Sequence, residues 1–223
     1  MSNERFSAWV FDLDNTLYPA ADLYDEIGAR MTAYIARTVG VDDAEALRLR
    51  ELYFHQYGAT IVGLVRHHGV DARDFLADVH EADHSVLVVD DELRELIADL
   101  PGRRLAFTNG GGGHPERVLE TLGLASCFDG IFDIEAAGLS PKPQRESYER
   151  LVKAFSIDPT RSILIEDTLR NLEPAHALGF TTALVGPVHP EPRPIYLNHW
   201  GSDVKALLRA LDRVQFGAAE ETR

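Results

Sequence analysis

The stretch AWVFDLDNT at residues 8–16 places an uninterrupted apolar run directly before two aspartates, Asp12 and Asp14. Such a run is typical of a strand buried inside a parallel sheet, and the polar residues after it lie at the carboxyl end of that strand. Three further runs have the same form: RLAFT at 104–108, SILI at 162–165 and TTALV at 181–185. Parallel sheets bind ligands at the carboxyl ends of their strands, so we expect the polar residues after these runs to share one site.

Segments with helical periodicity alternate with these runs, at residues 92–99, 115–122, 144–155 and 169–178. Alternating strands and helices indicate an α/β fold, in which a Rossmann-like parallel sheet core carries helices on both faces.

The alternation is interrupted between about residues 18 and 88, where no convincing strand occurs. Three segments there are typical of helices, at residues 23–38, 44–57 and 72–80. An inserted α-helical cap explains this stretch, because a cap can close over the strand ends and exclude water from a reacting group. We therefore predict a core domain from residues 1–17 and 89–223, and a cap domain from residues 18–88.

The chain of 223 residues, 45% of them hydrophobic, is long enough to bury one main core. Its single cysteine, Cys127, excludes an internal disulfide bond and a cysteine-rich zinc site. The first residues lack the features of a signal peptide, and no apolar run has the length that a bilayer span requires. We therefore predict a soluble, cytoplasmic protein without a membrane partner, with an extended loop over residues 187–194 and a frayed tail over residues 217–223.

The formal net charge is -14, from 36 acidic and 22 basic side chains. A charge of this sign keeps the surface soluble and repels nucleic acid polymers at long range. A phosphate-bearing partner is therefore expected to be a small phosphorylated metabolite that a local positive site attracts. The oligomeric state does not follow from the charge.

Asp12 and Asp14 are two positions apart, so on a strand their side chains share one face and can serve one metal ion and one substrate. The alternative is a turn in which Asp and Asn side chains make local hydrogen bonds. Asp167 follows the SILI run in the same way, and it would complete an oxygen-rich site suited to magnesium.

Lys142 stands between two prolines in the segment SPKP, on a stiff loop that could aim its ammonium group inward. A lysine fixed there would offset the crowded carboxylates and hold a phosphate oxygen, although an isolated lysine is as often a solvated surface residue. Thr108 and Asn109 offer a hydroxyl and an amide, which suit a phosphate group or the capping of a turn.

The segments DLDNT, FTN, SPKP and IEDTLRN follow one another in an order that resembles the four signature motifs of the haloacid dehalogenase (HAD) superfamily, in its phosphatase branch. The resemblance implies a phosphomonoester hydrolase that acts through an aspartyl-phosphate intermediate. It implies Asp12 as the catalytic nucleophile, Asp14 as the catalytic general acid and base, and Lys142 as the residue that steadies the phosphoryl group.

The same resemblance implies a Mg²⁺ cofactor, with Asp12, the backbone carbonyl of Asp14, and Asp167 as metal ligands. It implies substrate binding through Thr108, Lys142 and the backbone amide of Asn109.

The last motif departs from the commonest pattern of the superfamily at two positions. Glu166 stands where glycine is frequent, and Asn171 stands where a second aspartate is common. We expect Asn171 to orient a metal-bound water rather than to bind the metal itself. Asp14 argues against the haloacid dehalogenases proper, which typically lack this second aspartate, so phosphoryl chemistry is preferred over carbon–halogen cleavage.

The interrupted region carries a narrower resemblance, to the cap of the pyrimidine 5′-nucleotidases of this superfamily. It rests on YFHQYG at 53–58, GL at 63–64, HGVD at 68–71 and VH at 79–80, and with the other motifs it covers about residues 10–185. The resemblance implies hydrolysis of pyrimidine nucleoside monophosphates such as UMP or CMP. The alternatives are a phosphatase for a sugar phosphate or phosphoglycolate, a mutase that retains the phosphoryl group, and a catalytically silent binding protein of the same fold.

Other polar and aromatic residues of the chain have more than one interpretation. Tyr53 and Tyr57 would share a helix face, where one could stack on a base or both could pack the cap core. The glycines at 110–113 lack the lysine of a P-loop, which favours a turn before the next helix. Several histidines lack the spacing of zinc ligands, which favours surface or core roles: His55, His67, His68, His80 and His84.

Overall fold

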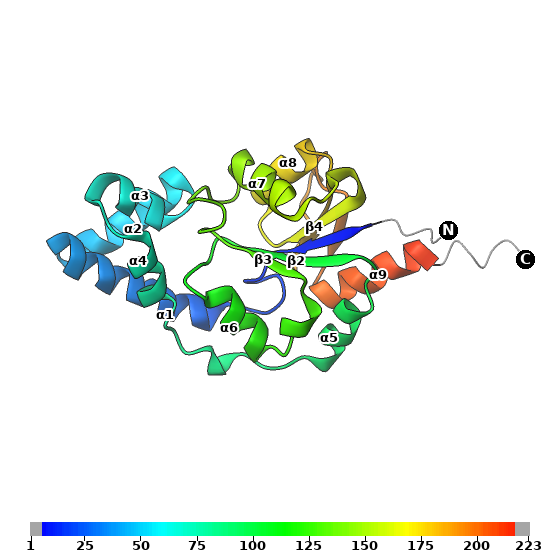
Figure 1. The fold of residues 1–223 in the computed structure, drawn as a ribbon, viewed down its shortest axis with the longest axis horizontal. Helices are drawn as coiled ribbons and strands as arrows, with labels where there is room; N and C mark the ends of the chain where they lie inside the picture. Colours follow the sequence, from blue (N-terminus) through cyan, green and yellow to red (C-terminus); the bar gives the residue numbers. More distant parts are fainter. Residues whose placement is uncertain (1–5, 217–223) are drawn as a thin grey trace, which may run out of the picture.

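A six-stranded parallel β-sheet forms the centre of the computed structural model, which describes residues 6–216 (Figure 1). The strand order is β3-β2-β1-β4-β5-β6. The strands are β1 (Ala8–Phe11), β2 (Arg103–Phe107), β3 (Gly130–Phe132), β4 (Ser162–Glu166), β5 (Thr181–Val185) and β6 (His199–Gly201). The predicted α/β fold with a parallel sheet is confirmed, whereas the tail predicted at 217–223 lies outside the described residues.

Helices cover both faces of the sheet, because alternate side chains of the fully buried strand β1 point to opposite faces. Trp9 and Phe11 join the hydrophobic cluster under α5, α6 and α9, and Ala8 and Val10 join the cluster under α7 and α8 (Figure 1). These helices are α5 (Asp91–Ala98), α6 (His114–Thr121), α7 (Arg145–Phe155), α8 (Leu169–Ala177) and α9 (Val204–Phe216). Short 3₁₀ turns occur at η2 (His84–Val86), η3 (Ala125–Cys127) and η4 (Pro159–Arg161).

Of the five α-helices between β1 and β2, the first four form one end of the molecule, while α5 packs on the sheet (Figure 1). The first four are α1 (Ala21–Ile35), which a π-helical turn η1 (Ala36–Gly40) extends, α2 (Asp43–Tyr57), α3 (Thr60–His68) and α4 (Ala72–Val79). Their apolar faces pack against one another in a separate cluster that includes Tyr34, Leu64 and Phe75. The inserted α-helical cap of the predicted fold is therefore present, while the domain boundaries at residues 17/18 and 88/89 stay a prediction.

Local sequence signals set the ends of the cap helices. The side chains of Asp42 and Asp71 accept hydrogen bonds from backbone N–H groups in the first turns of α2 and α4. Helix α2 ends at Gly58, whose φ of 86° lies in the left-handed region that glycine adopts freely. Gly63 lets α3 pack closely on α2, because a Cβ there would lie 2.2 Å from Cγ of Tyr53.

The sequence patterns missed four elements, namely α3, α9 and the edge strands β3 and β6. The two strands have only three residues each, which is too short for a period-2 pattern to be visible. The helix predicted at 44–57 ends where α2 ends, and no predicted helix covers the nine residues of α3, which follow after a two-residue turn.

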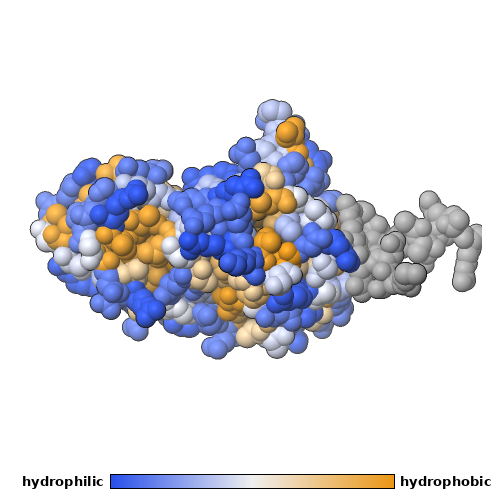
Figure 2. Space-filling view, turned by 45° about the horizontal axis from the view of Figure 1, so that its top comes forward, coloured by the Kyte–Doolittle hydropathy of each residue, from blue (hydrophilic) through white to orange (hydrophobic). Residues whose placement is uncertain are grey.

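Figure 2 shows a mostly hydrophilic face, on which hydrophobic side chains gather over the end that α1 to α4 form. The large hydrophobic side chains that are exposed include Leu47, Leu52 and Phe54 of α2. None of the helices in residues 6–216 combines the length and the apolar composition that a membrane span needs.

Candidate active site

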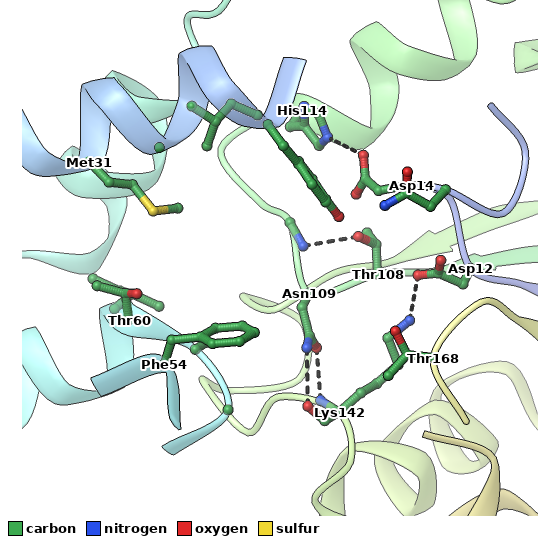
Figure 3. Close-up of a pocket in the computed structure, with 18 of the residues that line it drawn as sticks. Asp12, Asp14, Met31, Phe54, Thr60, Thr108, Asn109, His114, Lys142 and Thr168 are labelled. Atoms are coloured by element: carbon green, nitrogen blue, oxygen red, sulfur yellow. Dashed lines mark hydrogen bonds and ion pairs between the residues drawn. The ribbon is translucent and has the colours of Figure 1, made fainter. Parts of the chain in front are cut away.

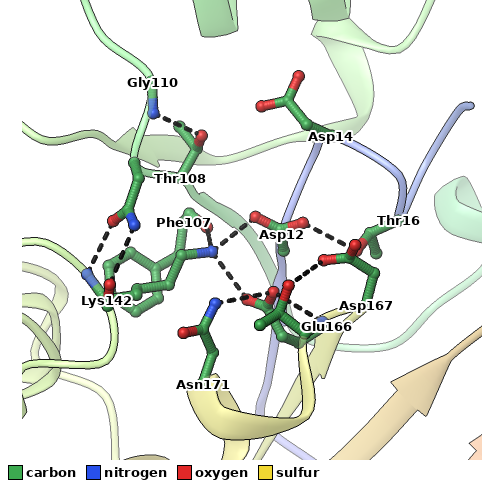
Figure 4. A network of polar contacts seen from close by, with 12 residues as sticks. Asp12, Asp14, Thr16, Phe107, Thr108, Gly110, Lys142, Glu166, Asp167 and Asn171 are labelled. Atoms are coloured by element: carbon green, nitrogen blue, oxygen red, sulfur yellow. Dashed lines mark hydrogen bonds and ion pairs between the residues drawn. The ribbon is translucent and has the colours of Figure 1, made fainter. Parts of the chain in front are cut away.

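The carboxyl ends of three strands meet at one edge of the sheet, because β1 is paired with both β2 and β4. Asp12 directly follows β1, and its backbone N–H donates to the carbonyl of Ile165 in β4 at 2.9 Å. Thr108 directly follows β2, and Asp167 directly follows β4. Figure 4 shows these side chains around one centre, with Lys142 reaching in from the loop before α7. The shared site expected from the strand ends is formed.

Lys142 is 2% exposed, and its ammonium group donates to three acceptors of the protein. These are Oδ1 of Asp12 at 2.6 Å, Oε2 of Glu166 at 2.8 Å and the carbonyl of Phe107 at 2.8 Å. Burial by itself lowers the pKa of Lys142, but the negative charges of Asp12 and Glu166 outweigh it and raise the pKa, so the ammonium stays charged. Because an ammonium has three donors, Lys142 must exchange one of these acceptors to bind a phosphoryl oxygen.

Both carboxylate oxygens of Asp12 are held in place. Oδ1 accepts from Lys142, and Oδ2 accepts from the hydroxyl of Thr16 at 2.8 Å. Burial, together with the negative charge of Glu166, raises the pKa of Asp12 to about 7, although Lys142 acts in the opposite direction. The positive charge of Lys142 therefore balances the negative charge of ionised Asp12 only in part.

The side chain of Asp14 is anchored on the other side of the site. Its Oδ1 accepts a hydrogen bond from the Tyr18 hydroxyl and lies 3.1 Å from Nε2 of His114 (Figure 3). Burial alone would raise the pKa of Asp14, but the hydrogen bonds and charge of His114 and the hydrogen bond of Tyr18 hold the pKa below its ordinary value.

Thr108 and Asn109 have different surroundings. The Asn109 side chain pairs with the backbone of Lys142: Nδ2 donates to its carbonyl at 3.1 Å, and Oδ1 accepts from its N–H at 2.7 Å (Figure 3). Thr108 Oγ1 accepts from the N–H of Gly110 at 2.9 Å, which leaves its own proton to be donated. The side-chain amide of Asn109 thus positions the Lys142 loop. The backbone N–H of Asn109 is still predicted to bind substrate.

Three carboxylates could hold a metal ion. Asp12, Glu166 and Asp167 each place one carboxylate oxygen within 4.8 Å of the others. Burial raises the pKa of both Glu166 and Asp167, as expected where negative charges crowd together. Within the described chain, Oδ1 of Asn171 is buried without a hydrogen-bond partner, while its Nδ2 donates to Glu166 at 3.0 Å. Carboxylates in excess of cationic partners and an unpaired amide oxygen fit a hard divalent cation such as Mg²⁺.

This donor set differs in part from the predicted one. Asp12 and Asp167 belong to both, and Glu166 is an addition. The carboxylate of Asp14 is turned towards Tyr18 and His114. The predicted metal ligand from this residue is its backbone carbonyl, and that prediction is unchanged.

A cavity of about 490 Å³ lies between the strand ends and the cap helices, and Asp12, Thr108 and Lys142 line its floor. Figure 3 shows Phe54 of α2 with its ring directed into this space, which Met31 of α1 also lines. Phe54 is 45% exposed, and the guanidinium of Arg170 lies 5.7 Å from the centroid of its ring. The volume suits a small metabolite, and the walls are largely apolar with polar groups at one end.

The two tyrosines singled out in the cap do not line this cavity. Tyr53 is buried beside α3, and its hydroxyl lies 2.7 Å from Nε2 of His68. Tyr57 makes the corresponding contact with His67 at 2.6 Å. Of the two interpretations of this pair, packing within the cap is the one found, and the neighbouring Phe54 of α2 lines the cavity instead.

Sequence patterns did not identify Glu166, Thr16 or His114 as parts of the site. A local signal existed for Thr16, which is four residues after Asp12, the spacing of its hydrogen bond. No local signal connects His114 with Asp14, because the two residues are 100 positions apart.

A family model described as haloacid dehalogenase-like hydrolase matches residues 6–179 of the chain. Together with the sheet, the cap and the carboxylate site, this match shows that the chain belongs to the haloacid dehalogenase-like hydrolases. The predicted membership of the superfamily is confirmed, and so is the prediction of an enzyme, as a hydrolase of this family.

Two curated proteins and one solved structure illustrate the similarity. Phosphate metabolism protein 8 of Saccharomyces cerevisiae is 34% identical over 136 residues, which are 55% of this chain and 42% of that protein. N-acetylmuramic acid 6-phosphate phosphatase of Pseudomonas aeruginosa is 27% identical, over 96% of this chain and 98% of that protein. A HAD phosphatase from Thermococcus onnurineus has the same fold, with a TM-score of 0.63, 14% identity, and coverage of 95% of this chain and 99% of that one. The chain thus spans less than half of the yeast relative.

Proposed function

We propose that this hydrolase is a Mg²⁺-dependent phosphomonoester phosphatase that attacks phosphorus with Asp12 and acts on pyrimidine nucleoside 5′-monophosphates such as UMP and CMP. The observation that carries the proposal is the group of buried Asp12, buried Lys142 and half-buried Asp167 at the floor of a cavity of metabolite size. Relatives named as phosphatases support the reaction class.

In the proposed reaction, a carboxylate oxygen of Asp12 forms a bond to phosphorus while the bond from phosphorus to the leaving oxygen breaks. Asp14, in its protonated form, gives its proton to that oxygen, and the alcohol departs. Asp14 then takes a proton from a water molecule, whose oxygen attacks the phosphorus of the aspartyl-phosphate. The bond to Asp12 breaks, and inorganic phosphate leaves. Lys142 keeps a positive charge beside the oxygens of the transferred group throughout.

Asp12, Asp167 and Glu166, with the backbone carbonyl of Asp14, would hold the Mg²⁺ ion. When bound, Mg²⁺ offsets the charge of the carboxylates and polarises the phosphoryl group. The ammonium of Lys142 offers one positive charge against the carboxylates of Asp12 and Glu166, which by themselves repel an incoming phosphate.

Removal of divalent cations with EDTA is expected to abolish phosphate release, and addition of Mg²⁺ is expected to restore it. Mg²⁺ should also raise the midpoint of thermal unfolding, and more so at about pH 8 than at about pH 5, because protons compete with the cation for the carboxylate of Asp12. Calorimetry at both pH values, with and without Mg²⁺, measures this difference.

The metal-free protein is the control, because without Mg²⁺ the contribution of Asp12 to stability is expected to fall, not rise, with increasing pH. The pKa of Asp12 is raised to about 7, so the folded state binds this proton more tightly than the unfolded chain. The contribution of Asp12 to stability is therefore present below the ordinary pKa of aspartate and is lost as the pH rises through about 7. Undiminished turnover after complete metal removal, or equal Mg²⁺ stabilisation at both pH values, would contradict the proposed site.

The pyrimidine assignment rests on the cap. Phe54 belongs to the segment that resembles the pyrimidine 5′-nucleotidases, and its ring is directed into the cavity (Figure 3). A partly exposed aromatic face in an apolar wall is a surface on which a nucleobase can stack. Phe54 is partly exposed although the Arg170 guanidinium lies over its ring, so the side chain has surface left for a planar group.

The substrate class is tested by phosphate release from UMP, CMP, dUMP, AMP, GMP and several sugar phosphates, with and without Mg²⁺. We expect Mg²⁺-dependent hydrolysis with a preference for pyrimidine monophosphates. A preference for sugar phosphates would remove the nucleotide assignment and leave the role of Asp12 in place. No release from any of these substrates would favour another small metabolite, such as phosphoglycolate, or a silent binding protein of this fold.

Phe54→Ala is expected to raise KM for UMP by about tenfold, because stacking on a base contributes about 1–3 kcal/mol. KM for p-nitrophenyl phosphate or a sugar phosphate serves as the comparison within the same variant. Leu52→Ala is the matched control: Leu52 is a residue of α2 that is 41% exposed and does not line the cavity. An unchanged KM for UMP in Phe54→Ala would place the base elsewhere.

A sugar phosphate is the second candidate substrate. The relative that matches the largest share of this chain among those compared above is named for N-acetylmuramic acid 6-phosphate. The cap also presents polar groups to the cavity, including Arg50, Glu51 and His55, which suit hydroxyl groups. The substrate panel and Phe54→Ala together separate this candidate from a nucleotide.

A further inference from the structure

Three buried histidines lie beside Asp14, and the reaction as described uses none of them. His114 is the first residue of α6, His84 is the first residue of η2, and His80 directly follows α4. The rings of His80 and His114 stack with a centroid distance of 4.8 Å. Burial of three imidazoles next to a carboxylate is costly unless their nitrogens are hydrogen-bonded.

A chain of hydrogen bonds connects the backbone carbonyl of Ala82, through His84 and His114, to Asp14. Nδ1 of His84 lies 2.8 Å from the carbonyl oxygen of Ala82, and since a carbonyl only accepts, this nitrogen donates. Burial lowers the pKa of His84, so its ring is neutral and Nε2 is an acceptor. That Nε2 lies 3.1 Å from Nδ1 of His114, which is therefore the donor of this contact.

The other ring nitrogen of His114 is thereby directed at Asp14. Nε2 of His114 lies 3.1 Å from Oδ1 of Asp14. A carboxylate oxygen and an unprotonated ring nitrogen are both acceptors, so one of these two atoms must carry a proton for them to form a hydrogen bond. Tyr18 donates to the same Oδ1. Tyr18 and His114 both contact Oδ1 of Asp14, and these contacts restrict the rotation of the carboxyl group. The other oxygen, Oδ2, can then face the leaving group.

The segment around His114 is built for this contact. The glycine turn at 110–113 precedes α6, and Gly113 has a φ of 80°. Gly112 passes directly against α4, where a Cβ would lie 2.5 Å from the backbone of Leu76. These glycines let α6 begin close to the cap, with His114 between η2 and Asp14.

We propose that His114 is a positioning residue that holds Asp14 in the orientation for proton transfer to the leaving oxygen, and that His84 fixes the ring of His114. The proposal rests on the proposed function, in which Asp14 is the general acid. It adds a role for the segment between α4 and α5, because the carbonyl of Ala82 and the ring of His84 set the direction of the hydrogen bonds.

The test compares two esters in the Mg²⁺-loaded enzyme: glycerol 2-phosphate, whose alcohol must be protonated as it leaves, and p-nitrophenyl phosphate, whose phenolate leaves without a proton. The ratio kcat/KM reports the transfer to Asp12, the step in which the leaving oxygen departs. His114→Leu is expected to lower kcat/KM for glycerol 2-phosphate by about 10²-fold, as for loss of a general acid, and by far less for p-nitrophenyl phosphate. His84→Leu should show the same selectivity with a smaller loss.

Two further variants separate positioning from damage to the fold. His114→Gln can donate from its amide nitrogen to Asp14, so it should recover part of the loss with glycerol 2-phosphate. In a His114→Leu/Asp14→Asn double variant, kcat/KM should equal that of Asp14→Asn alone, because His114 acts only through Asp14. His80→Phe is the control, since it keeps the stacked ring, and the only hydrogen bond of the His80 ring in the described chain is to Leu76.

Equal losses for both esters in His114→Leu and His114→Gln, or additive losses in the double variant, would overturn the proposal while leaving the function of Asp12 intact. An unchanged kcat/KM in His114→Leu would do the same. A wild-type enzyme that releases phosphate from neither ester would instead contradict the proposed function itself.

Discussion

Asp12→Asn is expected to lower phosphate release by about 10⁵-fold, to the background rate, because an amide has no anionic oxygen with which to attack phosphorus. The fold should be kept. An asparagine can accept from Lys142 with Oδ1, and its amide nitrogen can donate to the hydroxyl oxygen of Thr16. Because the pKa of Asp12 is raised to about 7, the neutral amide should leave the stability of the metal-free protein at about pH 8 unchanged or higher.

Steady-state phosphate release and thermal unfolding of the same preparation measure both halves of this prediction. Asp212→Asn, at an exposed position of α9, is the matched control and should retain the wild-type rate. Mass spectrometry of the Asp12→Asn protein excludes deamidation back to aspartate. Wild-type turnover in a verified Asp12→Asn preparation would remove the mechanism, and a large loss of stability would show that the carboxylate is structural.

Lys142→Met is expected to lower the free energy of unfolding by about 3–5 kcal/mol, because it leaves buried carboxylates without their cationic partner. Asp12 and Glu166 both lose a hydrogen bond to the ammonium. Their pKa values are already raised in the wild type, so protonation at low pH should relieve the repulsion. The destabilisation should therefore be largest at about pH 8 and shrink as the pH falls towards 5. Turnover should fall by at least about 10²-fold.

A double variant tests the electrostatic origin of this loss. Lys142→Met/Glu166→Gln removes one of the uncompensated charges and should recover part of the stability but none of the turnover. Lys153→Met, at an exposed position of α7, is the matched control for the substitution itself. If Lys142→Met were as stable as the wild type without metal at about pH 8, the ammonium would not be needed to balance the carboxylates.

Local patterns were sufficient to predict the main frame of the fold. The run at residues 8–11 is apolar at every position because both faces of β1 are covered, which is the condition of a central parallel strand. Asp12, Thr108 and Asp167 directly follow strands, and parallel strands bring their carboxyl ends to one edge. The convergence of these residues therefore followed from the sheet type, without knowledge of the strand order.

The partners of these residues did not follow from local patterns. The backbone amide of Asn109 stays a predicted substrate ligand, but its side chain, which also suited a phosphate group, holds the backbone of Lys142, which is 33 positions away. Whether an amide binds a ligand or a distant loop depends on which segment the tertiary structure places beside it. Phe54 and Tyr53 are neighbours on α2, and the packing of α3 at Gly63 decides which of the two is covered and which faces the cavity.

The sequence by itself determined the parallel sheet, the position of the helical insertion, and the carboxylates and lysine that carry the proposed chemistry. These features depend on residue periodicity and on short motifs, which are properties of neighbouring positions in the chain. Only the tertiary structure decided how the carboxylate charges are balanced, how Asp14 is held by Tyr18 and His114, and which cap side chain meets the substrate. Hydrogen bonds and charge interactions act between atoms a few ångströms apart, and here they join residues as far apart in the chain as Asp12 and Lys142, which are 130 positions apart.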